Sequence, residues 1–179
     1  MHGSGQHRSV GPAQQRLNAA CGLHWSAARL GVREATGRND GPEVESYLRV
    51  TGNRRGDPWC GAFQAAGQQA CGLPMPAGAG GARNWFALTP RTYYVRGIRG
   101  VPDSARLGHK VAFYYANLGR IGHVGQIAAI GRGVRRGRPA RGFVVRAGNT
   151  GVGGGRDGAG VHDLFYSAAD VYALSNWNY

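Results

Sequence analysis

Apolar side chains in the N-terminal part of the chain recur at the three- and four-residue spacing of α-helices. In the second of three such segments, Val44, Tyr47 and Leu48 form the face that we expect to be buried. Asp40 is placed to cap this segment, and Glu43 completes a capping box. The three predicted helices cover residues 12–30, 42–50 and 60–71.

Beyond residue 109 the apolar pattern changes from helical to extended. Short segments rich in Val, Ile, Phe and Tyr are separated by clusters of Gly, Asn and Asp, as in strands joined by turns. Helices first and strands second predict an α+β fold, with N-terminal helices packed on a C-terminal antiparallel β-sheet. Residues 84–104 give no clear pattern. The predicted strands cover residues 110–116, 121–130, 142–147, 161–166 and 170–174.

The length of 179 residues, 42% of them hydrophobic, is enough for one domain with a real core. We expect this domain over residues 13–179, after a polar, glycine-rich and disordered lead-in over residues 1–12. No stretch is apolar enough to span a membrane, and the first residues lack the apolar core of a signal peptide. If the protein acts outside the cytoplasm, we expect lysis, phage delivery or a secretion machine to release it.

The net charge of +13 rests on arginine, since Lys110 is the only lysine. Such a charge predicts an anionic partner, either nucleic acid or the carboxylates and phosphates of a bacterial envelope. The three cysteines are an odd number and do not indicate a disulfide framework. A bridge between Cys21 and Cys71 stays open.

Cys60 is the first candidate for chemistry. Asp57 and Pro58 form a turn just before it, so Cys60 falls in the first turn of the third predicted helix. There the free backbone N–H groups and the helix dipole favour a thiolate, which makes a cysteine nucleophilic near neutral pH. The alternative is that Cys60 is a small buried hydrophobic residue, as most free cysteines are.

The second and third predicted strands are expected to form a hairpin over residues 121–130 and 142–149. If Ile130 faces Gly142, paired positions sum to a constant and His123 falls opposite Asn149. Both would lie on a face that is otherwise apolar and directed at the core. The other face would carry polar residues such as Gln126 and Arg146.

A histidine and an asparagine beside a helix-starting cysteine form the constellation of a papain-like site. We expect His123 to take the proton of Cys60 and later to protonate the leaving amine, and Asn149 to orient the imidazole. The backbone N–H of Cys60 is the natural first donor of an oxyanion hole. His109 and His162 are weaker candidates, because no register places an asparagine or carboxylate opposite them.

Five motifs together resemble the CHAP family (cysteine, histidine-dependent amidohydrolase/peptidase), and in particular its phage- and mobile-element-associated peptidoglycan hydrolases. The resemblance implies a papain-like fold, chemistry that needs no metal ion or cofactor, and cleavage of an amide in the bacterial cell wall. It runs from about Leu30 to the C-terminus. The motifs are LGVRE (30–34), TGRNDGP (36–42), PWCGAF (58–63), GHVG (122–125) and GNT (148–150).

The chain departs from the family pattern at four positions. Ala147 stands where many members carry a glutamate two residues before the asparagine, which leaves the orienting role to Asn149 alone. His109 replaces an aspartate that is common in the preceding strand. Gly61 and Gln64 replace an alanine and an apolar residue.

We therefore expect a monomeric thiol amidase or endopeptidase that binds peptidoglycan and anionic envelope polymers. Trp59, Gln64 and Trp85 are expected to contact the substrate. One alternative is a nucleic-acid-binding protein that uses an arginine-rich loop over residues 131–142, where residues 136–139 (RGRP) have the form of a minor-groove AT-hook core. Another is an inactive relative that only binds the wall.

Overall fold

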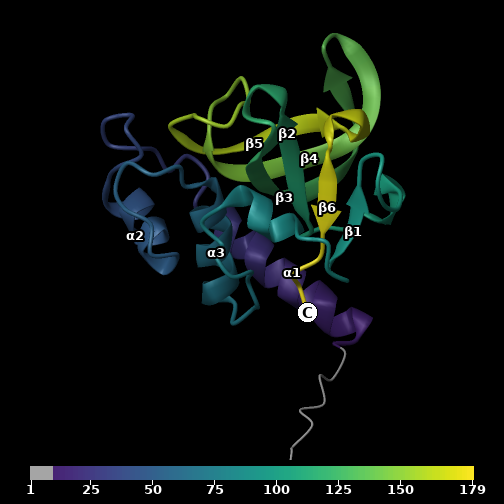
Figure 1. Ribbon diagram of the computed structural model, residues 1–179, viewed down its shortest axis with the longest axis horizontal. Helices are drawn as coiled ribbons and strands as arrows, with labels where there is room; N and C mark the ends of the chain where they lie inside the picture. The colour runs from purple at the N-terminus through teal and green to yellow at the C-terminus, as the bar shows by residue number, and fades with distance from the viewer. Residues whose placement is uncertain (1–9) are drawn as a thin grey trace, which may run out of the picture.

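Three α-helices precede a six-stranded antiparallel β-sheet in the computed structural model, which describes residues 10–179 (Figure 1). The predicted α+β fold is confirmed. The predicted lead-in, residues 1–12, falls largely on residues 1–9, which lie outside the described part. The first helix already begins at Pro12 and continues through Gly22. The helices are α1 (Pro12–Ala27), α2 (Pro42–Val50) and α3 (Cys60–Ala70).

The strands form one sheet in the order β1-β6-β2-β3-β4-β5, and every neighbouring pair is antiparallel. The first strand lies in the segment whose sequence pattern was unclear. The last strand begins later than predicted, at Ala173 instead of Asp170, because Asp170 belongs to a 3₁₀ turn over Ala168–Asp170. The strands are β1 (Thr92–Val95), β2 (Lys110–Tyr115), β3 (Arg120–Arg135), β4 (Arg138–Thr150), β5 (Gly160–Ser167) and β6 (Ala173–Ser175).

The hairpin of β3 and β4 is longer than predicted and projects beyond the rest of the sheet (Figure 1). Its turn is Arg136 and Gly137, which both have positive φ, 52° and 74°. The expected basic loop over residues 131–142 is therefore mostly paired strand. The predicted pairing of Ile130 with Gly142 is wrong, since Ile130 pairs with Phe143.

A register shift in the hairpin then restores the predicted alignment nearer the core. The shift lies between Ile127 and Ala129, and it brings Gln126 opposite Arg146. The residue numbers of this pair have the same sum as those of the predicted pairs Ile130–Gly142 and His123–Asn149. The strand residues closest to the helices therefore pair as predicted. The turn at the far end of the hairpin differs from the predicted loop.

The polar face of this hairpin lies against the helices, contrary to the expectation that the apolar face would. Gln64 of α3 donates a hydrogen bond to the backbone oxygen of Arg146 (3.4 Å). The Arg146 guanidinium pairs with Asp163 (2.7 Å) and donates to Leu23 O near the end of α1 (3.2 Å), where the helix dipole favours a cation. The opposite, apolar face has its own core, which includes Val111, Phe113, Ile127, Val145, Tyr166 and Leu174.

Four aromatic side chains hold the three helices together. Trp25 of α1, Tyr47 of α2 and the Trp59 and Phe63 rings at the start of α3 lie with ring centroids 5.3 to 6.3 Å apart. All five of these pairs are edge-to-face or tilted, which the ring quadrupoles favour over a face-to-face stack. Gly67 allows this packing, because a side chain there would come within 3.1 Å of Trp25.

The start of α2 differs from the predicted capping box. Gly41, with φ of 107°, is the residue before the helix, and its N–H donates to Glu45. Asp40 instead accepts hydrogen bonds from the Thr36 N–H and hydroxyl and from Arg55. The two hydrogen bonds from Thr36, and to a lesser extent the one from Arg55, lower the pKa of Asp40 to about 2. Asp40 therefore closes the preceding turn.

Cys21 and Cys71 form a disulfide, which the odd cysteine count did not indicate. Their Cα atoms are 6.0 Å apart, and the bond joins the middle of α1 to the residue that ends α3. Cys60 is left as the free thiol. The disulfide closes a segment with a sequence separation of 50 residues and so restricts the unfolded chain strongly.

Replacing both bridged cysteines, as Cys21→Ser with Cys71→Ser, is expected to lower the free energy of unfolding by about 4 kcal/mol, the loop-closure value for this separation. Denaturant titration followed by tryptophan fluorescence measures the change. Cys60→Ser keeps the bridge and serves as the control. An unchanged midpoint in the double variant would show that the bridge does not form.

Lys110 is fully buried between the sheet and α3. Its Nζ donates to Gln64 Oε1 (3.0 Å) and lies 5.5 Å from the centroid of the Trp85 ring. Burial lowers its pKa from the ordinary 10.5 to about 7, because an ammonium group loses its hydration there. The unfolded chain therefore binds more protons than the folded one between pH 7 and 10.5.

We expect the free energy of unfolding to fall with decreasing pH from 10.5 to 7 by about 1.4 kcal/mol per unit from Lys110 alone. Lys110→Met should remove this contribution, because methionine has similar volume and no charge to desolvate. Comparing denaturation at pH 7, 8 and 9 isolates the slope, with the exposed Arg49→Met as control. Parallel pH profiles for Lys110→Met and the wild type would show that the pKa of Lys110 is not lowered in the folded protein.

Candidate active site

The N-terminus of α3 lies where β3 and β4 stop pairing. The last pair toward the helix is Gln126 with Arg146, although β3 begins at Arg120 and β4 runs to Thr150. Gly148 leaves room for the helix at this point, because any side chain there would collide with the Trp59 ring and with Phe63. The helix start thus packs on backbone that the hairpin leaves uncovered.

Asn149 connects β4 to the residue before Cys60. In the amide orientation that satisfies its neighbours, Asn149 Oδ1 accepts from the Trp59 backbone N–H (3.3 Å), and Nδ2 donates to Asn39 Oδ1 (3.1 Å) and Gly158 O (3.0 Å). Its backbone has φ of 55°, a left-handed conformation that asparagine tolerates better than most residues. These bonds position the start of α3. The sequence predicted that Asn149 orients the His123 imidazole, but no hydrogen bond joins the two side chains in this structure.

Glu34 and Asn39, from two of the motifs, complete this network. The Trp59 indole N–H donates to one carboxylate oxygen of Glu34 (2.8 Å), and the Asn39 N–H donates to the other (3.0 Å). Asn39 in turn accepts from Asn149. The turn that precedes α2 is therefore linked through side chains to the start of α3.

Cys60 occupies the first turn of α3, as predicted, and is only 3% exposed. Burial raises the pKa of its thiol. Hydrogen bonds from the backbone N–H groups of Val124, Gly61 and Cys60, and the charge of Arg156, act in the opposite direction without cancelling the burial. The expected thiolate is therefore not the resting form, because desolvation outweighs the helix dipole. The contact with Val124 places the sulfur beside the backbone of His123.

His123 is 1% exposed, and neither of its ring nitrogens has a hydrogen-bond partner among residues 10–179. Its ring lies 6.1 Å from that of Phe113, its neighbour on β2. Burial, and to a lesser extent the charge of Arg156, lowers the pKa of His123 to about 4. Two unpaired buried nitrogens are costly and need an explanation, and a catalytic role is one of the few available.

The two rival histidines have structural surroundings. His109 Nδ1 lies 2.7 Å from the Tyr93 hydroxyl and accepts from the Arg106 N–H (3.3 Å). Burial lowers the pKa of His109 to about 4, so the imidazole is neutral. His162 lies on β5 and pairs with Ala147 of β4. Neither arrangement involves Cys60.

The three residues expected to contact substrate are buried in the core. Trp59 and Trp85 are 0% exposed, and Gln64 is 2% exposed. Trp85 donates its indole N–H to Ala79 O (2.8 Å), while Gln64 bridges Lys110 and Arg146. Their surfaces and polar groups are taken up by the protein in this structure. Cys60 and His123 are buried as well, and the substrate contacts stay a prediction.

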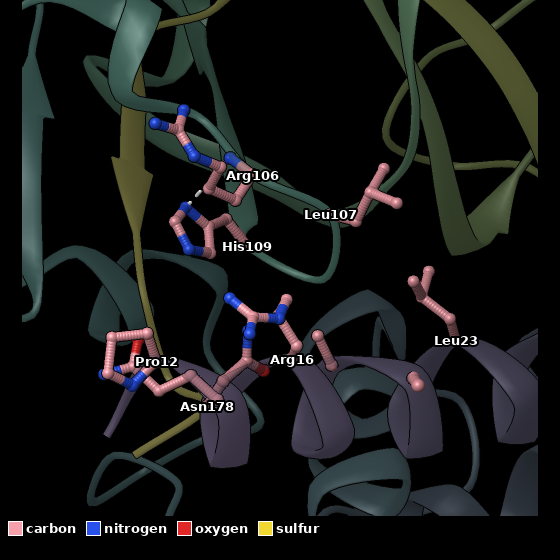
Figure 2. A pocket seen from close by; sticks show the side chains of 10 residues that line it. Pro12, Arg16, Leu23, Arg106, Leu107, His109 and Asn178 are labelled. Atoms are coloured by element: carbon pink, nitrogen blue, oxygen red, sulfur yellow. Dashed lines mark hydrogen bonds between the residues drawn. The ribbon is translucent and has the colours of Figure 1, made fainter. Parts of the chain in front are cut away.

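A groove of about 520 Å³ lies apart from these residues, between the first turns of α1 and the segment around His109 (Figure 2). Arg16, Arg106 and Asn178 are among the polar residues that line it. Cys60, His123 and Asn149 do not line it. The candidate catalytic residues therefore lie beneath the surface and outside this groove.

The arginine-rich hairpin tip is partly neutralised. Arg135 and Arg136 pair with Asp170 at 3.0 and 3.9 Å. Arg138 is exposed, but its backbone is paired with that of Arg135 in the ladder. The backbone of this segment is therefore committed to a β-hairpin, whereas an AT-hook enters the minor groove as a short extended segment.

Comparison of the chain with protein-family models, with curated proteins and with solved structures finds no match. Within residues 10–179 no three His, Cys, Asp or Glu side chains gather in a way that could hold a metal ion. In the same range, no helix has the length and apolarity needed to cross a bilayer.

Because burial raises its pKa, Cys60 should react slowly with iodoacetamide at pH 6 in the native protein, and its rate should keep rising above pH 9. Peptide mapping by mass spectrometry follows the label. The urea-unfolded protein, in which the thiol is hydrated, provides the fast control. Rapid native labelling at pH 6 would mean that the thiolate is populated in spite of burial.

Proposed function

We propose that this protein is a thiol-dependent hydrolase of the papain-like type that cleaves an amide bond in bacterial peptidoglycan. One observation carries the proposal. A free cysteine in the first turn of α3 lies against the backbone of β3 directly after His123, whose two buried nitrogens have no partner among the described residues. Unpaired groups of this kind are found at sites that bind or react.

The chemistry follows from the two side chains. His123 accepts the proton of the Cys60 thiol as the sulfur attacks the carbonyl carbon of the amide. The tetrahedral oxyanion takes a hydrogen bond from the Cys60 backbone N–H at the helix start. As the C–N bond breaks, His123 returns the proton to the leaving amine. Water, deprotonated by His123, then hydrolyses the thioester and restores the thiol.

The resting protein holds both groups neutral, with the thiol pKa raised and the imidazole pKa lowered by the same burial. Proton transfer between them therefore has to occur when a substrate is present and the site is open. A neutral resting thiol also protects the enzyme from oxidation, because the thiolate is the form that reacts.

The cell wall is the substrate that the CHAP-like motifs imply, and two features support it. Peptidoglycan and its associated polymers carry carboxylates and phosphates, which a chain of net charge +13 attracts. The Cys21–Cys71 disulfide favours an oxidising compartment, as expected for a protein that works outside the cytoplasm. We therefore propose that it acts on the wall after lysis, phage delivery or secretion.

Cys60→Ser and His123→Ala should each reduce the release of soluble muropeptides from purified sacculi by at least about 10³-fold, since the two residues act as a unit. Asn149→Ala should keep measurable activity and lower the melting temperature, because it loses the bonds to Trp59, Asn39 and Gly158. Mass spectrometry of the products identifies the bond that is cut.

His24→Ala, on the exposed side of α1, is the matched histidine control and should retain activity. Circular dichroism verifies that each variant folds. Full activity of Cys60→Ser would exclude thiol chemistry. Binding of sacculi without hydrolysis by the wild type would instead favour the inactive wall-binding alternative.

A further inference from the structure

The loop of residues 151–159, yellow-green in Figure 1, joins β4 to β5 and is fastened to the start of α3. The Gly158 N–H donates to Asn149 O (3.2 Å), and Asn149 Nδ2 donates to Gly158 O (3.0 Å). The same asparagine accepts from the Trp59 N–H beside Cys60. The base of the loop and the start of the catalytic helix are therefore held by one side chain.

Glycines fix the path of the loop. Gly154 and Gly155 have φ of 82° and 113°, conformations that other residues rarely adopt, and the Thr150 hydroxyl donates to Gly155 O (3.2 Å). A side chain at Gly158 would collide with the backbone of Thr150. The geometry on both sides of Arg156 is thus specified by the sequence.

Arg156 is the cation of this loop and lies two residues before Gly158, which Asn149 holds beside the start of α3. Its side chain is 28% exposed and pairs with Asp157 (3.0 Å), which is 61% exposed. Its charge lowers the pKa of both Cys60 and His123, so it lies within electrostatic range of both. Because those two residues are neutral in the resting protein, neither offers Arg156 a counter-charge.

We propose that Arg156 binds a carboxylate of the substrate close to the scissile amide, so that the site selects acidic peptides over their amidated forms. The inference rests on the proposed function and adds a specificity residue to it. A guanidinium group can hold a carboxylate through two parallel hydrogen bonds. The carboxylate of Asp157 is exposed, which makes its pair with Arg156 weak enough to be displaced by a substrate carboxylate.

The first test compares pairs of soluble muropeptides that differ at one stem residue, with a free carboxylate in one and a carboxamide in the other. Arg156→Gln should lower the ratio of kcat/KM for the carboxylate form to kcat/KM for the amide form about 10- to 100-fold, the effect of losing one charge-assisted pair; any change in the reacting groups themselves cancels in this ratio. Asp157→Asn should lower KM for the carboxylate form, because it removes the competing anion. Arg49→Gln on α2 is the exposed arginine control.

The second test does not require hydrolysis. The rate of Cys60 alkylation by iodoacetate, divided by the rate with iodoacetamide, reports the electrostatic potential at the sulfur, and accessibility cancels in the ratio. Arg156→Gln should lower this ratio at least about threefold, while Arg49→Gln should leave it unchanged. Added salt should reduce the difference between the wild type and Arg156→Gln.

The two tests separate the inference from the function on which it rests. If the wild type cleaves muropeptides and Arg156→Gln keeps the preference for the carboxylate form, the role of Arg156 is wrong and the hydrolase stands. An unchanged alkylation ratio leads to the same conclusion. If the wild type cleaves neither form, the hydrolase and the carboxylate selection are both overturned.

Discussion

The start of α3 depends on one amide side chain, that of Asn149. The first backbone N–H groups of a helix have no acceptor within the helix, and the N–H of the residue just before it also needs an acceptor when that residue is buried. Asn149 Oδ1 satisfies the Trp59 N–H, while Nδ2 joins the turn at Asn39 and the loop at Gly158. Three segments that are distant in sequence thus meet at the residue that precedes Cys60. The left-handed backbone conformation at position 149 also favours asparagine there.

Burial, more than the helix dipole, controls the charge state of the site. A helix N-terminus stabilises an anion by a modest amount, whereas complete desolvation of a thiolate costs considerably more. The same reasoning applies to His123 and to Lys110, whose pKa values are both lowered by burial. The positive charge of Arg156 lowers the pKa of both Cys60 and His123, but burial remains the larger influence on each.

Sequence periodicity predicted the helices and most strands, because amphipathic spacing is local. It did not predict the register shift near Ile127 or the two-residue turn at Arg136 and Gly137, since neither changes the apolar pattern. The two errors in the hairpin cancelled, so that Gln126 pairs with Arg146 as assumed. Burial of Trp59 and the Cys21–Cys71 bridge depend on how the helices pack together, which spacing along the chain does not encode.

The anchoring bonds of Asn149 do not exclude the orienting role that its position suggested. An amide oxygen can accept two hydrogen bonds, and among the described residues Oδ1 of Asn149 accepts one, from the Trp59 N–H. One acceptor site on Oδ1 is therefore left for the His123 N–H that the proposed triad assigns to it. Such a bond would fix the tautomer whose other nitrogen accepts the Cys60 proton. In the described residues neither nitrogen of His123 makes that bond, so Asn149 acts here as the anchor of the helix start that carries Cys60.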